Sequence, residues 1–155
     1  MCFFKAKKIK SFKMLLVKIA WPGLIRKKSL RLKLLENEKI IVEQTGAILR
    51  IIFNQPEKRN AVSLEMWEAV EAALTKYAPD PSVRVLIMSG AGGKAFVSGA
   101  DISKFESERS SAEAVEYYNS TTTRVYDMVE AFPKPTIAQI NGFCVGGGVA
   151  LSVCC

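Results

Sequence analysis

The first regular pattern of apolar positions is a pair of β-branched runs at residues 39–43 and 47–53. A short link of Gln44, Thr45 and Gly46 separates the two runs. Strand-forming runs joined by a few residues that include glycine are typical of a β-hairpin. The pattern therefore predicts two antiparallel strands in this part of the chain.

A helical period follows, in which apolar residues recur at intervals of three and four and create one buried face. This stripe consists of Trp67, Val70, Leu74 and Tyr77. Ser63 precedes the stripe and is a favourable N-cap, and Asp80 with Pro81 is expected to end the helix. We expect the stripe to pack in the core rather than to bind a cofactor.

A second, longer helix is predicted further along the chain. Ser110 and Glu113 form a capping-box pattern at its start, and Pro133 and Pro135 stop it. Its apolar stripe consists of Val115, Tyr118, Thr122, Val125, Val129 and Phe132. One side of this helix is therefore expected to be buried.

Residues 83–88 predict a short buried strand and residues 136–140 predict another strand, and each strand leads into a glycine-rich turn. The turn segments lie at residues 93–102 and 141–148, and residues 149–153 are expected to start a helix. Backbone N–H groups left free at such turns can bind an oxyanion, and they need no reorganisation during a reaction. The start of a helix adds free N–H groups and a partial positive charge. The sequence thus predicts a site where negative charge develops on a thioester or ester oxygen.

The glycine-rich turns do not match either common nucleotide-binding loop. A Walker-type loop would need glycine at Met88 and serine or threonine at Ala95. The dinucleotide fingerprint would need a third spaced glycine where Leu151 stands. We therefore reject both nucleotide-loop interpretations.

The net charge of +7 on the 155 residues belongs to one end of the chain. Residues 1–33 hold eleven basic side chains and no acidic one, whereas residues 34–155 hold eleven basic and fifteen acidic side chains. Lys18 and Pro22 interrupt the apolar run at residues 14–25, which excludes a signal peptide, and the run is too short to span a membrane. We expect residues 1–34 to be a basic, disordered extension. An organelle transit peptide, attachment to a membrane surface and a misassigned start remain open, and nucleic-acid binding is disfavoured because no fold signature accompanies the charge.

The four cysteines, Cys2, Cys144, Cys154 and Cys155, show no metal-ligand spacing, and the chain contains no histidine. This composition argues against a metal site and against a Cys-His catalytic pair. Reduced thiols are the simplest interpretation, and they fit a cytoplasmic location. If the basic extension is a transit peptide, the mitochondrial matrix is the alternative.

Three segments together carry a family resemblance. They read NQPEKRNAVS, KAFVSGADIS and KPTIAQINGFCVGGGVALS, and they resemble the crotonase superfamily of enoyl-CoA hydratases and isomerases. The resemblance implies an α/β fold built as a spiral of β-β-α units, which is truncated here, with residues 35–155 forming the N-terminal portion of the domain. It also implies an acyl-CoA thioester as substrate, no cofactor apart from the coenzyme A of that substrate, and a homo-oligomer, either a trimer or a hexamer. Because the chain stops inside a predicted helix, we expect it to be a fragment.

The resemblance assigns roles to eight positions. The backbone N–H groups of Ala100 and Gly147 are expected to form the oxyanion hole. The positions expected to line coenzyme A are Lys58, Arg59, Ala61, Ser98, Asp101 and Ile102. Judged from the residues alone, Lys58 and Arg59 would belong to a solvated loop. Asp101 would cap the short helix that it begins. Glu106 would be a solvated surface residue.

One departure from the family pattern bears on the chemistry. Standard hydratases of the family use two glutamates as general acid and base. The first would stand at Ala150, and the second would follow Cys155. Two hypotheses remain open, an enoyl-CoA hydratase or isomerase type of protein that stabilises an enolate, and a catalytically inactive fragment that binds coenzyme A.

Overall fold

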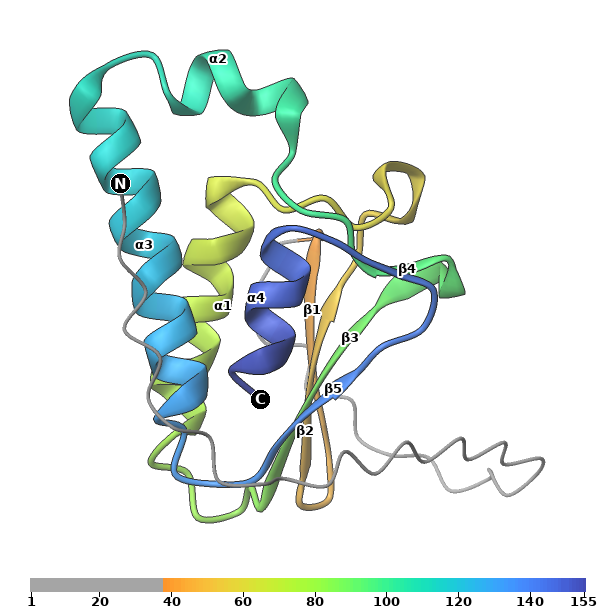
Figure 1. Ribbon diagram of the computed structural model, residues 1–155. Coiled ribbons are helices and arrows are strands. Elements are labelled where there is room, and N and C mark those ends of the chain that lie inside the picture. Colours follow the sequence, from red (N-terminus) through yellow and green to blue (C-terminus); the bar gives the residue numbers. More distant parts are fainter. Residues whose placement is uncertain (1–37) are drawn as a thin grey trace, which may run out of the picture.

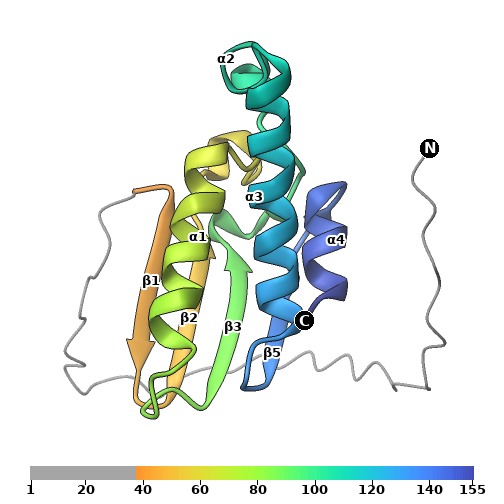
Figure 2. The ribbon, with the colours of Figure 1, turned by 90° about the vertical axis from the view of Figure 1, so that its left-hand side faces the viewer.

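The structure is a computed structural model that describes residues 38–155 (Figure 1). The expected basic extension at residues 1–34 and the expected domain start at Leu35 lie outside the described residues. Within residues 38–155 strands and helices alternate, and the α/β class predicted from the sequence is confirmed. The main sheet has four strands in the order β1-β2-β3-β5, and helices α1 and α3 lie side by side over one of its faces (Figure 2).

The predicted hairpin is present. Strand β1 (Ile40–Thr45) pairs antiparallel with β2 (Ile48–Phe53), with Ile40 opposite Phe53 and Thr45 opposite Ile48. Gly46 has a φ of 58°, a left-handed conformation that glycine adopts without strain and that closes the turn. The β-branched runs identified in the sequence thus form both strands of the hairpin.

Two parallel strands extend the sheet beyond the hairpin. Strand β3 (Val85–Gly90) pairs with β2, and β5 (Thr136–Gln139) pairs with β3. The sequence placed β3 at residues 83–88, two residues too early. Val83 is instead a buried residue that precedes the strand, and its N–H donates to the carbonyl of Asp80 at 3.2 Å.

Helix α1 (Leu64–Tyr77) buries the whole predicted stripe. Ser63 takes the N-cap position as expected, but its hydroxyl makes no capping bond. A carboxylate oxygen of Glu108, far along the chain, accepts the N–H of Leu64 at 3.1 Å instead. The helix ends at Tyr77 rather than at the expected Asp80 and Pro81, because Pro79 already prevents its continuation.

The C-terminal end of α1 is held by Lys134, which precedes β5. Its ammonium donates to the carbonyls of Tyr77 and Ala78 at 2.8 Å and to that of Asp80 at 2.7 Å. A cation at this position satisfies carbonyls that have no partner within the helix. Lys134 therefore joins the first helix to the strand that leads into the second glycine turn.

Helix α3 spans Ala112–Glu130. The predicted capping box at Ser110 and Glu113 was wrong, because the N-cap lies one residue later. Ser111, not Ser110, is the N-cap, and its hydroxyl accepts the N–H of Ala114 at 3.2 Å. Two adjacent serines make the start ambiguous in the sequence, and the hydroxyl three residues before a free N–H caps the helix. The buried residues of the helix are Tyr118, Thr121, Val125 and Val129. Thr121 thus takes the place expected for Thr122, which is only half-buried, as is Val115.

The remaining elements are short. Strands β4 (Ala95–Val97) and β6 (Phe143–Cys144) form a separate parallel pair, and α4 (Gly147–Val153) follows β6. Helix α2 (Phe105–Glu108) precedes α3. Three 3-10 turns lie at Pro56–Lys58, Ala91–Gly93 and Ile102–Lys104.

The core joins these layers through aromatic contacts. The ring of Phe53 in β2 lies edge-on to Trp67 of α1 and to Phe96 of β4, with centroids 6.2 Å and 6.1 Å apart. All three side chains are almost fully buried. The pair β4-β6 is thus fastened to the main sheet by packing in the core.

Between residues 38 and 155, no helix has the length and apolar character that a membrane crossing requires.

Candidate functional site

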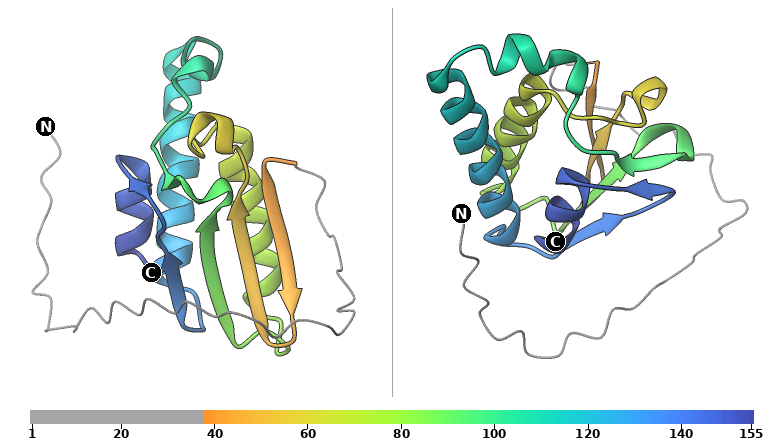
Figure 3. Two further views of the ribbon diagram at one scale, coloured as in Figure 1. Left: turned by 90° about the vertical axis from the view of Figure 1, so that its right-hand side faces the viewer. Right: turned by 45° about the horizontal axis from the view of Figure 1, so that its top comes forward.

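The two glycine segments identified in the sequence lie next to each other. Strands β4 and β6 pair in parallel, with Ala95 opposite Phe143 and Val97 opposite Cys144. In Figure 3 the blue segment that leads into α4 correspondingly runs beside the green segment around β4. The N–H of Val145 extends this pairing by donating to the carbonyl of Val97 at 3.1 Å. Because the strands are parallel, the glycine turns that follow β4 and β6 lie at the same end of the pair.

The two turns touch through residues that have no side chain. Gly99 has a φ of 107° and Gly146 a φ of 55°, and a Cβ atom built on Gly146 would lie 3.6 Å from the Cα of Gly99. The helix that follows is just as close to β4, because a Cβ atom on Gly148 would lie 2.3 Å from the carbonyl oxygen of Val97. Glycine is thus required at position 148 for the backbone of this helix to approach β4 so closely.

The N–H of Ala100 points away from Val62, the residue with which Ala100 pairs. Val62 donates to the carbonyl of Gly99 at 2.8 Å and accepts the N–H of Asp101 at 2.9 Å. Successive residues of an extended chain point to opposite sides, so the N–H of Ala100 faces away from Val62. No acceptor for this N–H exists within residues 38–155, and Ala100 is exposed.

Gly147 is the first residue of α4, which begins two residues earlier than the expected start at residue 149. The first N–H groups of a helix have no acceptor inside that helix. In the described part of the chain the N–H of Gly147 has none outside it either, and the residue is half-buried. Both predicted oxyanion donors thus carry an N–H without a protein acceptor, on two turns that are in contact.

The loop at residues 55–61 lies beside the first glycine turn and is held by Asn60, a residue that the sequence did not single out. Its buried side chain accepts the N–H of Gln55 at 3.0 Å and donates to the carbonyls of Ala91 at 3.0 Å and Ala95 at 2.8 Å. Arg59 and Asn60 have φ angles of 53° and 56°, a left-handed conformation that asparagine adopts more easily than most residues. Asparagine in a polar loop that also contains proline was the available signal for a structured turn.

Lys58 and Asp101 form the central ion pair of the site. The ammonium of Lys58 lies 2.8 Å from a carboxylate oxygen of Asp101 and 2.7 Å from the hydroxyl of Ser103. The side chain of Asp101 is only 5% exposed, that of Lys58 41%. Asp101 also accepts the side-chain amide of Gln55 at 3.2 Å and caps the turn at Ile102–Lys104 through the N–H of Ser103, as predicted.

The surroundings of Asp101 act on its pKa in two directions. Burial raises the pKa of the carboxyl group, but the hydrogen bonds from Lys58, Ser103 and Gln55 together outweigh burial and hold the pKa well below its ordinary value. Asp101 is therefore ionised at neutral pH. It cannot serve as the proton donor of the site, in agreement with the sequence analysis.

The other predicted coenzyme A residues differ in exposure. Ala61 is buried, whereas Ile102 is 83% exposed. The hydroxyl of Ser98 donates to the carbonyl of Lys58 at 3.3 Å, which ties the loop at residues 55–61 to the first glycine turn. The guanidinium of Arg59 is exposed and lies 5.2 Å from the ring centroid of Phe143. The loop, the first turn and β6 are thus joined by direct contacts.

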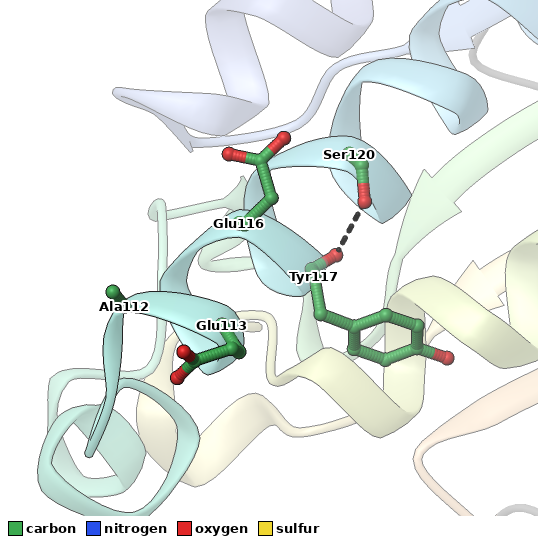
Figure 4. Close-up of a pocket in the computed structure, with 5 residues that line it drawn as sticks. All are labelled: Ala112, Glu113, Glu116, Tyr117 and Ser120. Carbon is green, nitrogen blue, oxygen red and sulfur yellow. Dashed lines mark hydrogen bonds between the residues drawn. The ribbon is translucent and has the colours of Figure 1, made fainter.

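A hollow elsewhere on the surface does not involve these residues. It lies along α3 and is lined by Ala112, Glu113, Glu116, Tyr117 and Ser120 (Figure 4). All five come from one helix, and the hydroxyl of Ser120 is satisfied by the carbonyl of Tyr117 at 3.0 Å. No group of three or more potential metal-ligating side chains occurs among residues 38–155. The glycine turns therefore remain the candidate site.

The ion pair predicts how stability depends on pH. At pH 7, Asp101→Asn is expected to lower the free energy of unfolding by about 2 kcal/mol, because Lys58, Ser103 and Gln55 lose a charged acceptor. The pKa of Asp101 is lowered by folding, so this contribution is present above the ordinary value of 3.8 and is lost as the pH falls below it. The difference between wild type and variant should therefore narrow in acid, measured by urea unfolding at several pH values.

The exposed Glu106 provides the matched control for this experiment. Glu106→Gln removes a carboxylate from the same region and should change the free energy of unfolding by less than about 0.5 kcal/mol. A difference between wild type and Asp101→Asn that stays constant from pH 7 into acid would contradict the role assigned to the carboxylate.

The geometry defines an α/β protein with a pair of glycine turns that leave two N–H groups without acceptors. The family profile described as enoyl-CoA hydratase/isomerase matches residues 48–155. The chain belongs to this family, and the resemblance predicted from the three sequence segments is confirmed.

Relatives named for different activities share this similarity. The chain is 38% identical over 118 residues to a crotonyl-CoA hydratase of Syntrophomonas wolfei, an alignment that covers 76% of this chain and 45% of that protein. It is 34% identical over 117 residues to the mitochondrial 3-hydroxyisobutyryl-CoA hydrolase of Homo sapiens, covering 75% of this chain and 30% of that protein. The chain thus spans less than half the length of these two relatives.

A solved structure confirms the fold. The crystal structure of an enoyl-CoA hydratase/carnithine racemase from Magnetospirillum magneticum matches with a TM-score of 0.74 and 39% sequence identity, over 81% of this chain and 47% of that chain. The predicted crotonase-like α/β fold is therefore confirmed for about half of the length of a crotonase structure.

Proposed function

We propose that the protein binds an acyl-CoA thioester and stabilises its enolate through the backbone N–H groups of Ala100 and Gly147. The observation that carries this proposal is the contact between the turns of Gly99 and Gly146, each of which is followed directly by an N–H that has no acceptor within residues 38–155. Two such donors, supplied by distant parts of the chain, suit one oxygen atom better than two separate ligands.

The chemistry requires stabilisation of negative charge at the thioester oxygen. Removing a proton next to the thioester carbonyl, or adding a nucleophile to a conjugated double bond, moves negative charge onto that oxygen. Backbone N–H groups that are already oriented stabilise this charge more than they stabilise the neutral carbonyl. Loss of one such donor typically costs about 100-fold to 1,000-fold in rate.

Coenzyme A is proposed to lie along the loop at residues 55–61 and the segment at residues 98–102. Lys58 shares its charge with Asp101, whereas Arg59 keeps an exposed guanidinium. Because a guanidinium can bind a phosphate through two parallel hydrogen bonds, Arg59 is the better candidate to contact the phosphate groups of coenzyme A. Ala61, Ser98, Asp101 and Ile102 complete the proposed lining.

Hydratase or isomerase chemistry is the proposed reaction of the whole protein, as a homo-oligomer, either a trimer or a hexamer, in the cytoplasm or alternatively in the mitochondrial matrix. The group that transfers the proton is not assigned. Ala150 has no ionisable side chain, and Asp101 is held in the ionised form by Lys58.

A second candidate function is binding of coenzyme A esters without turnover. One observation favours it: alanine, which cannot transfer a proton, stands at position 150. In this hypothesis the site still binds the thioester oxygen, but the bound ester is not converted.

The experiment uses the purified chain with two thioesters. Acetoacetyl-CoA ionises to an enolate that absorbs in the near ultraviolet, so the absorbance reports the charge on the bound ligand, and free coenzyme A serves as the control. Crotonyl-CoA is tested in parallel by loss of the absorbance of its conjugated thioester. We expect acetoacetyl-CoA to bind as the enolate at neutral pH.

The outcomes separate the two candidates. Turnover of crotonyl-CoA above a control without protein would support the enzyme and exclude the inactive fragment. Enolate binding without turnover would support the second candidate. If acetoacetyl-CoA bound with no enolate absorbance, the oxyanion-hole assignment would be wrong.

A further inference from the structure

Tyr126 of α3 lies directly against the start of α4. Its hydroxyl donates to the carbonyl of Gly147 at 3.3 Å. A Cβ atom built on Gly147 would lie 3.1 Å from this hydroxyl oxygen and 3.8 Å from Cζ2 of Trp67. The absence of a side chain at position 147 therefore lets two aromatic residues pack against the backbone of the second glycine turn.

The two aromatic residues support each other. The rings of Trp67 and Tyr126 meet edge to face, with centroids 5.5 Å apart and an angle of 84° between their planes. Trp67 is 2% exposed and belongs to the core, so it provides a fixed surface for the phenol. Burial raises the pKa of Tyr126 to about 12, so the hydroxyl remains protonated and can donate at neutral pH.

The second glycine turn needs support from outside itself. Gly146, Gly147 and Gly148 are consecutive, and glycine has more backbone freedom than any other residue. A run of three cannot be anchored by side chains of its own. The hydroxyl of Tyr126, placed by a helix of 19 residues, is a polar contact that reaches the middle glycine from another element.

We propose that Tyr126 is a positioning residue: by holding the carbonyl of Gly147 it fixes the position of this residue, so that the Gly147 N–H, on the other side of the same Cα, points at the oxygen of the bound thioester. The role rests on the proposed function, since it concerns the same donor. Tyr126 acts through Gly147 and is not assigned a contact with the substrate. The phenol thus controls how strongly the site stabilises the enolate, while the loop at residues 55–61 controls affinity for coenzyme A.

The test is Tyr126→Phe, which keeps the ring against Trp67 and removes only the hydroxyl. We expect the affinity for the enolate of acetoacetyl-CoA to fall about threefold to tenfold, the range for loss of one neutral hydrogen bond. The pKa of bound acetoacetyl-CoA should rise, while the affinity for coenzyme A stays within about twofold. A merely structural role would change both ligands together.

Tyr118→Phe is the matched control, because Tyr118 is a buried tyrosine on the same helix whose hydroxyl has no hydrogen-bond partner within the described residues. It should leave the binding of both ligands unchanged. If Tyr126→Phe also left the enolate affinity and the pKa of the bound ligand unchanged, the positioning role would be overturned while the proposed function stood. If wild type gave no enolate absorbance, the proposed function would fail, and the role of Tyr126 with it.

A double substitution tests the contact itself. In Gly147→Ala the new methyl group meets the hydroxyl of Tyr126, and we expect weaker enolate binding. Tyr126→Phe removes the oxygen that the methyl group meets, so the double variant should bind the enolate no more weakly than Gly147→Ala alone. Losses that simply add in the double variant would show that the two residues act independently, against the proposal.

Discussion

Gly147→Pro is expected to weaken binding of the acetoacetyl-CoA enolate about 100-fold or more, while binding of coenzyme A itself is unchanged. Proline has no backbone N–H, so this substitution removes the proposed donor. It should do so without breaking the helix, because proline is well tolerated at the first position of an α-helix, and Gly147 is the first residue of α4. The measurement is the near-ultraviolet titration of the purified variant.

Gly147→Ala is the control for this substitution. It places a Cβ atom at the same position, 3.1 Å from the hydroxyl of Tyr126, but it keeps the N–H. The difference between the two variants therefore reports the donor rather than the crowding. Equal enolate affinity in the proline and alanine variants would show that the N–H of Gly147 does not contact the thioester oxygen.

Gly142→Ala is expected to lower the free energy of unfolding by about 4 kcal/mol, from overpacking and left-handed strain together. Gly142 has a φ of 79°, and a Cβ atom there would lie 2.0 Å from the carbonyl oxygen of Lys94. That same oxygen accepts the N–H of Phe143 at 3.0 Å, so the clash falls on the hydrogen bond with which the pairing of β4 and β6 begins. Because this pairing brings the two glycine turns together, enolate binding should be lost as well.

Gly46→Ala separates strain from crowding. Gly46 also has a positive φ, 58°, but no atom lies within 4 Å of a Cβ atom built there. In Gly46→Ala only the left-handed conformation is disfavoured, so the free energy of unfolding is expected to fall by about 1 kcal/mol. Urea unfolding of Gly142→Ala and Gly46→Ala measures this difference. Similar losses of unfolding free energy in the two variants would mean that the β4-β6 pair shifts to make room for the added methyl group.

The features that were predicted correctly depend on residues close together in the chain. The hairpin follows from two β-branched runs around Gly46, and the buried face of α1 follows from the spacing of Trp67, Val70, Leu74 and Tyr77. Such patterns report which side of an element is buried, because strands and helices have fixed periods. They do not place the ends as well: Pro79 ended α1 before the expected Asp80 and Pro81.

Helix starts were harder to predict because a cap can come from any part of the chain. Ser63 occupies the N-cap of α1, yet the capping acceptor is Glu108, and at α3 the second of two adjacent serines caps the helix. A hydroxyl beside the start is a local signal, whereas a carboxylate from another element is not. The sequence therefore indicated where α1 begins without indicating which group satisfies its free N–H.

The glycine turns, their spacing and the family resemblance were all apparent from the order of residues, because a turn depends on the backbone freedom of its own glycines. The contact between Gly99 and Gly146, the hydrogen bonds of Asn60 to Ala91 and Ala95, and the packing of Tyr126 against Gly147 appear only in the folded chain. These contacts join residues 21 to 47 positions apart, and the period of a strand or helix carries no information about its partner. Burial of the core and the pairing of β4 with β6 select the partners.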